Sequence, residues 1–305
     1  MGVVTRGLGA LGALVAIGVL AACSGGTPEP GDAFAYDASA PRDVVDSGVV
    51  NAPYPVAVHE LSYRSGDDRV EAYLAVPPGA GARPAVLYLH AARSDRTQLL
   101  QPALWLAARG VVTMTITAPS IQDEPADLPP REALERYASQ AARDVIAARR
   151  ALDLLAARSD VDPERLGVVG WSAGGRAAAI LAGVDSRVRA AVLLAPGAAP
   201  VSEFVAAAPK DLRVAVEETM SRIDPFAAIA RAPAGGVLVQ AGREDEVVPR
   251  RATEALVASA PPATELRWYD AGHALNDDAY REHMSWLARR LAVTGPPVAG
   301  ATTGP

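Results

Sequence analysis

The sequence predicts an α/β fold, in which a mostly parallel sheet of eight strands is flanked by helices. Two observations carry this prediction. Short apolar segments alternate along the chain with longer amphipathic ones, which is typical of a parallel sheet covered by helices. Half of the 305 residues are hydrophobic and the mean hydropathy is +0.12, so the chain can bury the core of one sizeable domain or two small ones.

The first 22 residues have the pattern of a secretory signal peptide. One positive charge, Arg6, precedes an apolar run over 8–20, and small residues follow. Leu20-Ala-Ala-Cys23 resembles a bacterial lipobox, in which the cysteine becomes the acylated first residue of the mature chain. We therefore expect export to the cell envelope and a membrane anchor through lipid on Cys23. The alternative is an uncleaved signal anchor, for which the run is short and rich in glycine.

The two ends of the remaining chain differ in composition from its middle. Residues 23–55 are rich in Gly, Pro, Ala, Ser and Asp without a sustained period, so we expect a disordered tether. Residues 293–305 are similar, and we expect a disordered tail. The folded domain is predicted over 56–292. The full chain has 29 basic and 35 acidic residues, a net charge of −6, which argues against a nucleic-acid partner.

The first half of the domain contains four predicted strands. Segments 56–63 and 69–76 alternate in polarity around a Gly-Asp turn, which predicts an antiparallel hairpin. The apolar segments 85–89 and 111–117 are predicted to be buried strands. An amphipathic helix is predicted between these two, over 97–109.

The second half repeats a strand-helix alternation. A long helix is predicted over 131–158, where apolar residues recur every three or four positions. Four strands are predicted at 166–169, 188–194, 236–240 and 265–269. Three of them precede helices, at 173–182, 250–258 and 277–291. The insertion at about 198–235 is expected to form a small cap over the site, with one helix at 211–223 and Asp224-Pro-Phe226 after it.

A serine lies at the turn between strand 166–169 and helix 173–182. The segment Gly170-Trp-Ser-Ala-Gly174 has the arrangement of a nucleophile elbow, a sharp turn that exposes Ser172 above the end of the sheet. The helix that follows presents free N–H groups and a positive dipole, which suit a developing oxyanion. The pentapeptide alone also fits an ordinary Gly/Ser turn, so the rest of the chain must supply a base and a carboxylate.

His273 is the expected base among the four histidines. It follows the last predicted strand and precedes the last helix, in a loop that can reach Ser172. His59 lies within a strand, and His283 within the last helix fits a surface or packing residue. His90 starts the loop after an early strand and is expected to hold that loop by hydrogen bonds.

Asp245 is the expected carboxylate that orients the imidazole. It lies just after strand 236–240, and its neighbours Glu244 and Glu246 are expected to be solvated. Ser172, Asp245 and His273 then occur in the chain order of α/β-hydrolase triads.

Two backbone N–H groups are expected to bind the oxyanion. Ala173, directly after the nucleophile, supplies one, and the loop after strand 85–89 supplies the other, from Ala92 or, as a second choice, Ala91. We expect Ala91 and Trp171 to contribute to the substrate pocket. For Trp171, packing under the elbow is an equally good alternative.

These segments together resemble the α/β-hydrolases of the dienelactone-hydrolase-like and acyl-peptidase-like esterase group, over about 70–291. The resemblance implies hydrolysis of small-molecule carboxylic esters through an acyl-enzyme, without a metal or an organic cofactor. Two departures concern residues of the site. The group's oxyanion loop usually begins His-Gly, where this chain has His90-Ala91, and dienelactone hydrolases proper use a cysteine, where this chain has Ser172. The second departure favours a general serine esterase.

Other functions remain open from the sequence. A peptidase or an acyltransferase would use the same triad, although no β-propeller precedes the domain as in prolyl-oligopeptidase-type enzymes. A non-catalytic envelope lipoprotein could keep the fold as a binding scaffold, which the altered oxyanion loop allows and the intact triad disfavours.

Overall fold

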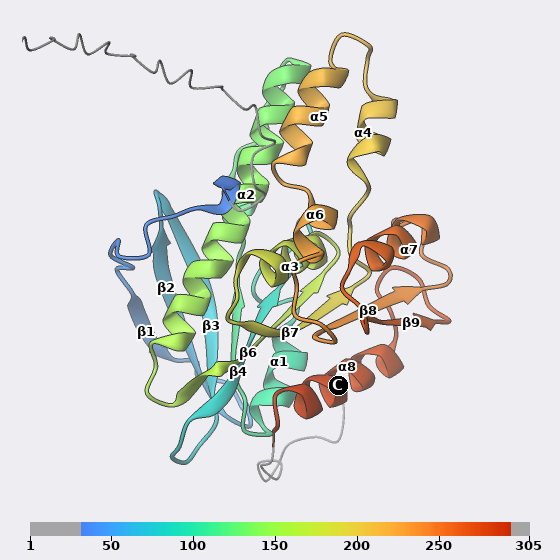
Figure 1. The fold of residues 1–305 in the computed structure, drawn as a ribbon. Helices are drawn as coiled ribbons and strands as arrows, with labels where there is room; N and C mark the ends of the chain where they lie inside the picture. Colours follow the sequence, from blue (N-terminus) through green and yellow to red (C-terminus); the bar gives the residue numbers. More distant parts are fainter. Residues whose placement is uncertain (1–31, 294–305) are drawn as a thin grey trace, which may run out of the picture.

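The computed structural model describes residues 32–293, which form an α/β domain around one nine-stranded sheet (Figure 1). The sheet order is β1-β2-β3-β5-β4-β6-β7-β8-β9. The first three strands pair antiparallel at one edge, and the six from β5 to β9 in this order are parallel. The strands are β1 (Val45–Val49), β2 (Ala57–Ser65), β3 (Asp68–Val76), β4 (Arg83–Leu89), β5 (Val112–Ile116), β6 (Val161–Trp171), β7 (Val188–Leu194), β8 (Val237–Gly242) and β9 (Glu265–Tyr269).

Helices cover both faces of the sheet, as the alternating sequence pattern predicts. The helices are α1 (Leu100–Ala107), α2 (Pro130–Ala156), α3 (Ala173–Val184), α4 (Val201–Ala207), α5 (Arg213–Ser221), α6 (Pro225–Ile229), α7 (Arg250–Ser259) and α8 (Asp277–Arg290). Two short 3-10 helices, η1 (Asp32–Phe34) and η2 (Pro119–Gln122), complete the set within 32–293. The predicted mostly parallel α/β architecture is confirmed, with one strand more than the eight expected.

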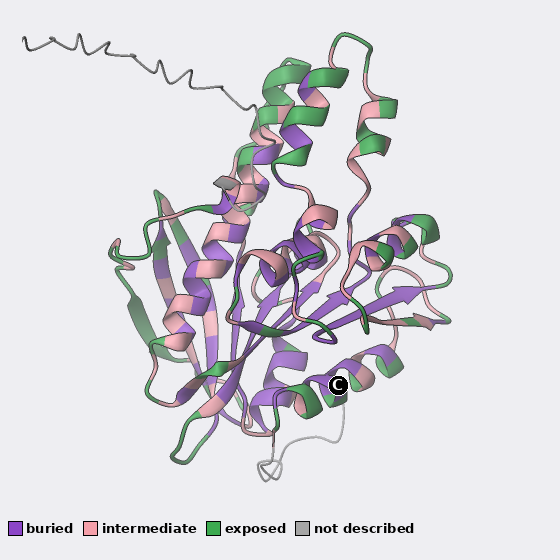
Figure 2. Ribbon diagram, in the orientation of Figure 1, coloured by how far each residue is buried: buried purple, intermediate pink, exposed green. Residues whose placement is uncertain are grey.

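The core has two layers because the central strands are apolar on both faces (Figure 2). On one face, α2, α3 and α7 contribute side chains such as Leu152, Leu181 and Leu256. On the other, α1 and α8 contribute Leu106 and Leu287. Because the central strands are buried on both faces, their segments of the sequence are unbroken apolar runs.

The insertion between β7 and β8 contains three helices rather than the single helix expected. The predicted helix corresponds to α5, which packs beside the N-terminal half of α2, with α4 next to it (Figure 1). The predicted Asp224-Pro-Phe226 segment begins α6, where the Asp224 carboxylate caps the helix by accepting a hydrogen bond from the Phe226 N–H at 2.9 Å. The insertion leaves the sheet at the carboxyl end of β7, on the side where Ser172 lies.

The predicted disordered tether over 23–55 is wrong from residue 32 onward. Phe34 is fully buried in a cluster with side chains of α2, α3, α5 and α6. Strand β1 then pairs with β2 and becomes the ninth strand of the sheet. This strand is exposed along its whole length, so it carries no burial pattern that a sequence could reveal.

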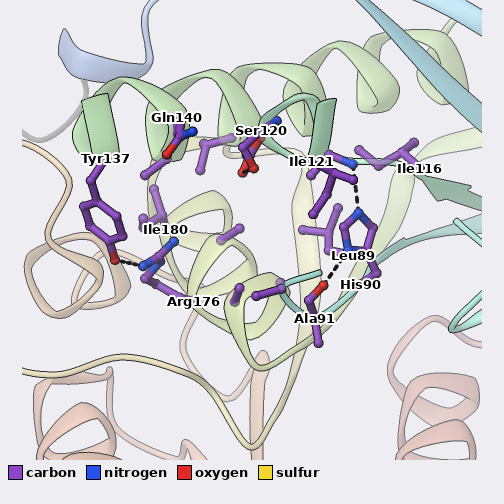
Figure 3. A pocket seen from close by; sticks show the side chains of 18 residues that line it. Leu89, His90, Ala91, Ile116, Ser120, Ile121, Tyr137, Gln140, Arg176 and Ile180 are labelled. Atoms are coloured by element: carbon purple, nitrogen blue, oxygen red, sulfur yellow. Dashed lines mark hydrogen bonds between the residues drawn. The ribbon is translucent and has the colours of Figure 1, made fainter. Parts of the chain in front are cut away.

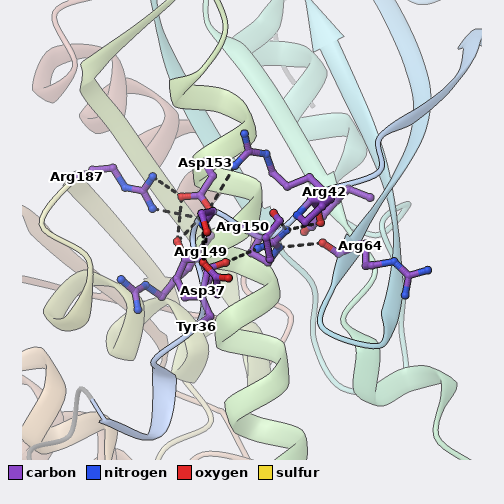
Figure 4. Close-up of polar contacts among 12 residues, drawn as sticks. Tyr36, Asp37, Arg42, Arg64, Arg149, Arg150, Asp153 and Arg187 are labelled. Atoms are coloured by element: carbon purple, nitrogen blue, oxygen red, sulfur yellow. Dashed lines mark hydrogen bonds and ion pairs between the residues drawn. The ribbon is translucent and has the colours of Figure 1, made fainter.

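Arginines of α2 hold this N-terminal segment through its backbone carbonyls (Figure 4). Arg150 donates hydrogen bonds of 2.9–3.1 Å to three carbonyl oxygens of this segment, those of Asp37, Ala40 and Pro41, and it also donates one of 2.9 Å to the Arg64 carbonyl on β2. Arg149 donates to the Phe34 carbonyl at 2.8 Å. The composition of this segment does not reveal that it is ordered, because the arginines that bind it lie about 110 residues away along the chain.

The expected signal peptide over 1–22, the lipid attachment site at Cys23 and almost all of the expected tail over 293–305 lie outside the described residues. None of the helices within 32–293 has the length and apolar character needed to cross a membrane.

Candidate active site

Ser172 lies at a sharp turn between β6 and α3. Its backbone has φ 55° and ψ −111°, in the left-handed half of conformational space that side chains other than glycine rarely adopt. The turn leaves no room for side chains at its two glycines. A Cβ at Gly170 would lie 2.0 Å from the Gly174 carbonyl oxygen, and one at Gly174 would lie 2.2 Å from the Leu89 oxygen. The spacing of the two glycines around the serine therefore follows from the geometry of the turn.

Ser172, His273 and Asp245 form one chain of hydrogen bonds. His273 Nε2 lies 2.9 Å from Ser172 Oγ, and His273 Nδ1 lies 2.9 Å from Asp245 Oδ2. Because an ionised carboxylate only accepts hydrogen bonds, Nδ1 carries the proton that it donates to Asp245. Nε2 is then free to accept the hydroxyl proton of Ser172. The structure thus brings together the three side chains that the sequence predicted.

Asp245 is fixed by its own loop. Its side chain is only 3% exposed. Its Oδ1 accepts hydrogen bonds from the backbone N–H groups of Val247 and Val248 at 2.8 and 2.9 Å, which leaves Oδ2 for His273. Of the three neighbouring acids, Asp245 is therefore the one that faces the imidazole, and Glu244 and Glu246 are exposed as expected.

Trp171 holds the His273 loop. Its indole Nε1 donates a hydrogen bond to the His273 carbonyl oxygen at 3.0 Å. The indole and imidazole rings lie with centroids 6.0 Å apart. The hydrogen bond to the His273 loop supports the packing role that the sequence allowed for Trp171.

Neither of the two predicted oxyanion donors makes a hydrogen bond to any of residues 32–293. Ala173 is the first residue of α3, whose N–H has no partner within the helix. In the loop after β4, the Ala91 N–H donates to Gln98 Oε1 at 2.7 Å, whereas the Ala92 N–H makes no hydrogen bond among the described residues. This difference favours Ala92 over Ala91 as the second donor.

His90 positions this loop, as expected from the sequence. Its Nδ1 lies 2.7 Å from the Ala91 carbonyl oxygen, and its Nε2 accepts a hydrogen bond from the Ala118 N–H at 2.8 Å. This pattern requires a neutral ring with the proton on Nδ1. Burial lowers the pKa of His90, which favours the same neutral form.

The other two histidines lie away from Ser172. His59 pairs with Asp46 at the β1–β2 edge of the sheet, at 2.9 Å. His283 on α8 is fully buried, which lowers its pKa to about 3 and makes it a neutral packing residue. Of the four histidines, only His273 reaches the serine.

A cavity of about 150 Å³ adjoins the elbow between α2, α3 and the loop after β4 (Figure 3). Ala173, Gly174 and the predicted pocket residue Ala91 line it, together with Ala92. Most of its other walls are apolar and come from Leu89, Ile116, Ile121, Ala141, Val145, Ala177 and Ile180.

Polar side chains that the sequence analysis did not select also line this cavity. The Asp144 carboxylate accepts hydrogen bonds from the N–H and the hydroxyl of Ser120, at 3.0 and 2.7 Å. Arg176 and Tyr137 bond to each other on the side opposite Ala91 (Figure 3). Arg176 was detectable, because a residue four positions after Ser172 lies one helical turn above it. Nothing in the sequence joined Tyr137 or Asp144 to the site.

Comparison with known families decides the classification. The model of the dienelactone hydrolase family matches residues 70–287, more than two thirds of the chain. The chain belongs to the dienelactone hydrolase family. This membership confirms the predicted α/β-hydrolase fold and the prediction that the protein is an enzyme of the hydrolase class.

Solved structures with similar folds include several esterases. Acetyl xylan esterase 1 from a Thermoanaerobacterium species is 18% identical with a TM-score of 0.73, over 86% of this chain and 92% of that one. An acetyl xylan esterase from a Paenibacillus species is 22% identical with a TM-score of 0.69, over 82% and 89%. The S-formylglutathione hydrolase from Agrobacterium tumefaciens is 17% identical with a TM-score of 0.61, over 80% and 99%. No curated protein sequence matches the chain.

Proposed function

We propose that this protein hydrolyses carboxylic esters through an acyl-enzyme on Ser172. The observation that carries the proposal is the hydrogen-bonded chain from Ser172 Oγ through His273 to the buried Asp245. A serine hydroxyl is a weak nucleophile, and it needs a base within hydrogen-bond reach. Family membership and the esterases among the similar structures support ester chemistry at this site.

Each residue has one role in the proposed reaction. Ser172 Oγ attacks the ester carbonyl carbon while His273 Nε2 takes the hydroxyl proton. The N–H groups of Ala173 and Ala92 bind the oxyanion of the tetrahedral intermediate. His273 then returns the proton to the leaving alcohol, and Asp245 stabilises the imidazolium between these steps. Water repeats the sequence on the acyl-enzyme and releases the acid.

Labelling with a fluorophosphonate tests this proposal against a non-catalytic scaffold. We expect covalent modification of Ser172, found by mass spectrometry of the peptide that contains it, and hydrolysis of 4-nitrophenyl acetate. Ser172→Ala should remove both, whereas Ser202→Ala on exposed α4 should change neither. Unchanged turnover in Ser172→Ala would reject the assignment of the nucleophile, and an unreactive wild-type protein would favour the scaffold.

The unlabelled wild-type enzyme separates hydrolysis from the other triad reactions. An esterase transfers the acyl group to water and leaves peptide amides intact. A peptidase would cleave a peptide 4-nitroanilide at a comparable rate. An acyltransferase would give more ester than acid when a second alcohol is added at millimolar concentration.

We also propose that the enzyme is exported and held at a membrane of the cell envelope by lipid on Cys23. The support is the sequence of residues 1–23, with its single early arginine, apolar run and Leu-Ala-Ala-Cys end. Because only the Cys23 thiol can carry this lipid, Cys23→Ser should shift the protein from the membrane to the soluble fraction. Incorporation of an alkyne-labelled fatty acid should be lost in the same variant. A wild-type protein that incorporates no fatty acid would overturn this part of the proposal.

A further inference from the structure

The loop after β4 begins with a peptide group that is held on both sides, the one between His90 and Ala91 (Figure 3). Its carbonyl oxygen lies against the first turn of α3, where a Cβ at Gly174 would be only 2.5 Å from it. Its N–H donates a hydrogen bond to Gln98 Oε1 at 2.7 Å. Because the C=O and N–H of a trans peptide point in opposite directions, the two contacts grip one rigid plane from its two sides.

This peptide lies between the two backbone segments that carry the proposed oxyanion donors. Ala92 follows it in the loop, and Ala173 directly precedes Gly174 at the start of α3. The contact of the His90 carbonyl with Gly174 therefore sets how closely the two segments approach. An oxyanion needs both N–H groups at about 2.7–3.1 Å, so a loop that moves away from α3 would lose the Ala92 donor.

Gln98 extends from a backbone that is itself fixed. Its own N–H donates to the Asp95 carbonyl oxygen at 3.2 Å. Leu99, the next residue, is only 2% exposed. Two residues before Gln98, the Arg96 guanidinium pairs with Glu60 on β2 at 2.6 Å. The Gln98 amide is thus an anchored acceptor that can hold the Ala91 N–H in one place.

Gln98 and His90 act on different peptides of the loop. His90 Nδ1 bonds to the Ala91 carbonyl oxygen at 2.7 Å, in the peptide that also contains the Ala92 N–H, so the ring sets the direction of that donor. Gln98 acts one peptide earlier, where the loop meets α3. It also occupies the Ala91 N–H, whereas the Ala92 N–H makes no hydrogen bond to any of residues 32–293.

We propose that Gln98 is a positioning residue of the oxyanion site. By accepting the Ala91 N–H, it keeps the loop seated against α3 and leaves the Ala92 N–H as the free donor. This inference rests on the proposed ester hydrolysis and adds a residue that does not touch the substrate. The oxyanion exists only in the tetrahedral intermediates, so loss of this contact should slow turnover without weakening the binding of a neutral ester.

Gln98→Met tests the proposal, because methionine is also unbranched and its sulfur is only a weak acceptor. We expect kcat for 4-nitrophenyl acetate to fall about tenfold, less than the loss of about 10²–10³-fold that follows removal of an oxyanion donor. Acylation and deacylation both pass through an oxyanion, so KM should change by less than about twofold. Gln101→Met, on the exposed side of α1, is the matched control and should keep the wild-type kcat.

Two further measurements separate positioning from a purely structural role. A trifluoromethyl ketone adds to the serine and forms a tetrahedral oxyanion, so its inhibition constant should rise in Gln98→Met by about the factor by which kcat/KM falls. Gln98→Asn is the second variant, in case Gln98→Met does not fold. It keeps a polar amide but is one methylene too short to reach the Ala91 N–H, and it should show the same selective loss of kcat.

The outcomes separate this inference from the proposed function. If the folded Gln98 variants keep the wild-type kcat and bind the ketone as tightly as the wild type does, the positioning role is overturned and ester hydrolysis stands. A loss that appears mainly as a higher KM, or only as a lower unfolding temperature, also overturns it. A wild-type protein that neither labels at Ser172 nor hydrolyses 4-nitrophenyl acetate overturns both proposals.

Discussion

We predict that Asp144 makes the stability of the protein depend on pH through its buried carboxylate. Burial removes water from the carboxylate and raises its pKa from an ordinary value of 3.8 to about 6. The two hydrogen bonds from Ser120 lower the pKa, but by less than burial raises it. The folded protein therefore holds this proton more tightly than the unfolded chain does. The contribution of Asp144 to stability is fully present below pH 3.8 and is lost as the pH rises through about 6.

The size of this loss follows from the two pKa values of Asp144, 3.8 in an unfolded chain and about 6 in the fold. At 1.36 kcal/mol for each tenfold change in proton affinity, the free energy of unfolding falls by about 3 kcal/mol between low pH and pH 8. By the same relation, about half of this fall in the free energy of unfolding has already occurred at pH 5. Asp144→Asn removes the titration and retains groups that can bond to Ser120. The free energy of unfolding of this variant relative to wild type should therefore rise by about 1–2 kcal/mol from pH 5 to pH 8.

Urea unfolding of both proteins at the two pH values measures this difference. Any pH-independent change in hydrogen bonding cancels in the comparison, because it shifts the variant equally at both pH values. Asp127→Asn, in an exposed loop, is the control and should show no such change. If the difference between Asp144→Asn and wild type is the same at pH 5 and pH 8, or is smaller at pH 8, the assignment of a buried ionised carboxylate is refuted.

Three other substitutions test parts of the site. Asp245→Asn should lower kcat about 10⁴-fold, because the amide favours the wrong imidazole tautomer. Glu246→Gln is the control for this change. Equal losses of kcat in the two variants, measured in steady-state assays, would contradict the role of Asp245. Gly174→Ala should destabilise the fold by about 3 kcal/mol or more, because its Cβ would meet the Leu89 oxygen at 2.2 Å. In thermal unfolding it should differ clearly from Gly272→Ala, whose Cβ would have no contact closer than 3.7 Å. His90→Ala should lower kcat/KM about tenfold to hundredfold by releasing the loop that carries Ala92, and His59→Ala should not; equal kinetics of the two variants would show that His90 does not support the oxyanion site.

The parts of the site that the sequence predicted depend on local constraints. Ser172 is recognisable because its turn requires glycines at fixed positions, and Asp245 and His273 because each directly follows a strand of a parallel sheet. The central strands were found for a similar reason, since burial on both faces leaves an unbroken apolar run. In these cases the decisive interaction lies within a few residues of the pattern.

The parts that were missed depend on distant partners. Strand β1 is exposed on both faces, and only its pairing with β2 identifies it. Nothing in the sequence around Arg150 indicates that this side chain binds the carbonyl oxygens of residues 37, 40 and 41. In the same way, Tyr137 joins the cavity only because α2 crosses α3 near Arg176.

The burial of Phe34 limits how far a lipid-anchored enzyme can travel from the bilayer. Only eight residues separate Cys23 from Asp32, where the described fold begins. A fully extended chain of this length spans about 30 Å at most, roughly the thickness of the hydrocarbon core of one membrane. An enzyme anchored in the proposed way would work on molecules that come to the lipid surface, and it could not reach polymers farther out in the surrounding compartment.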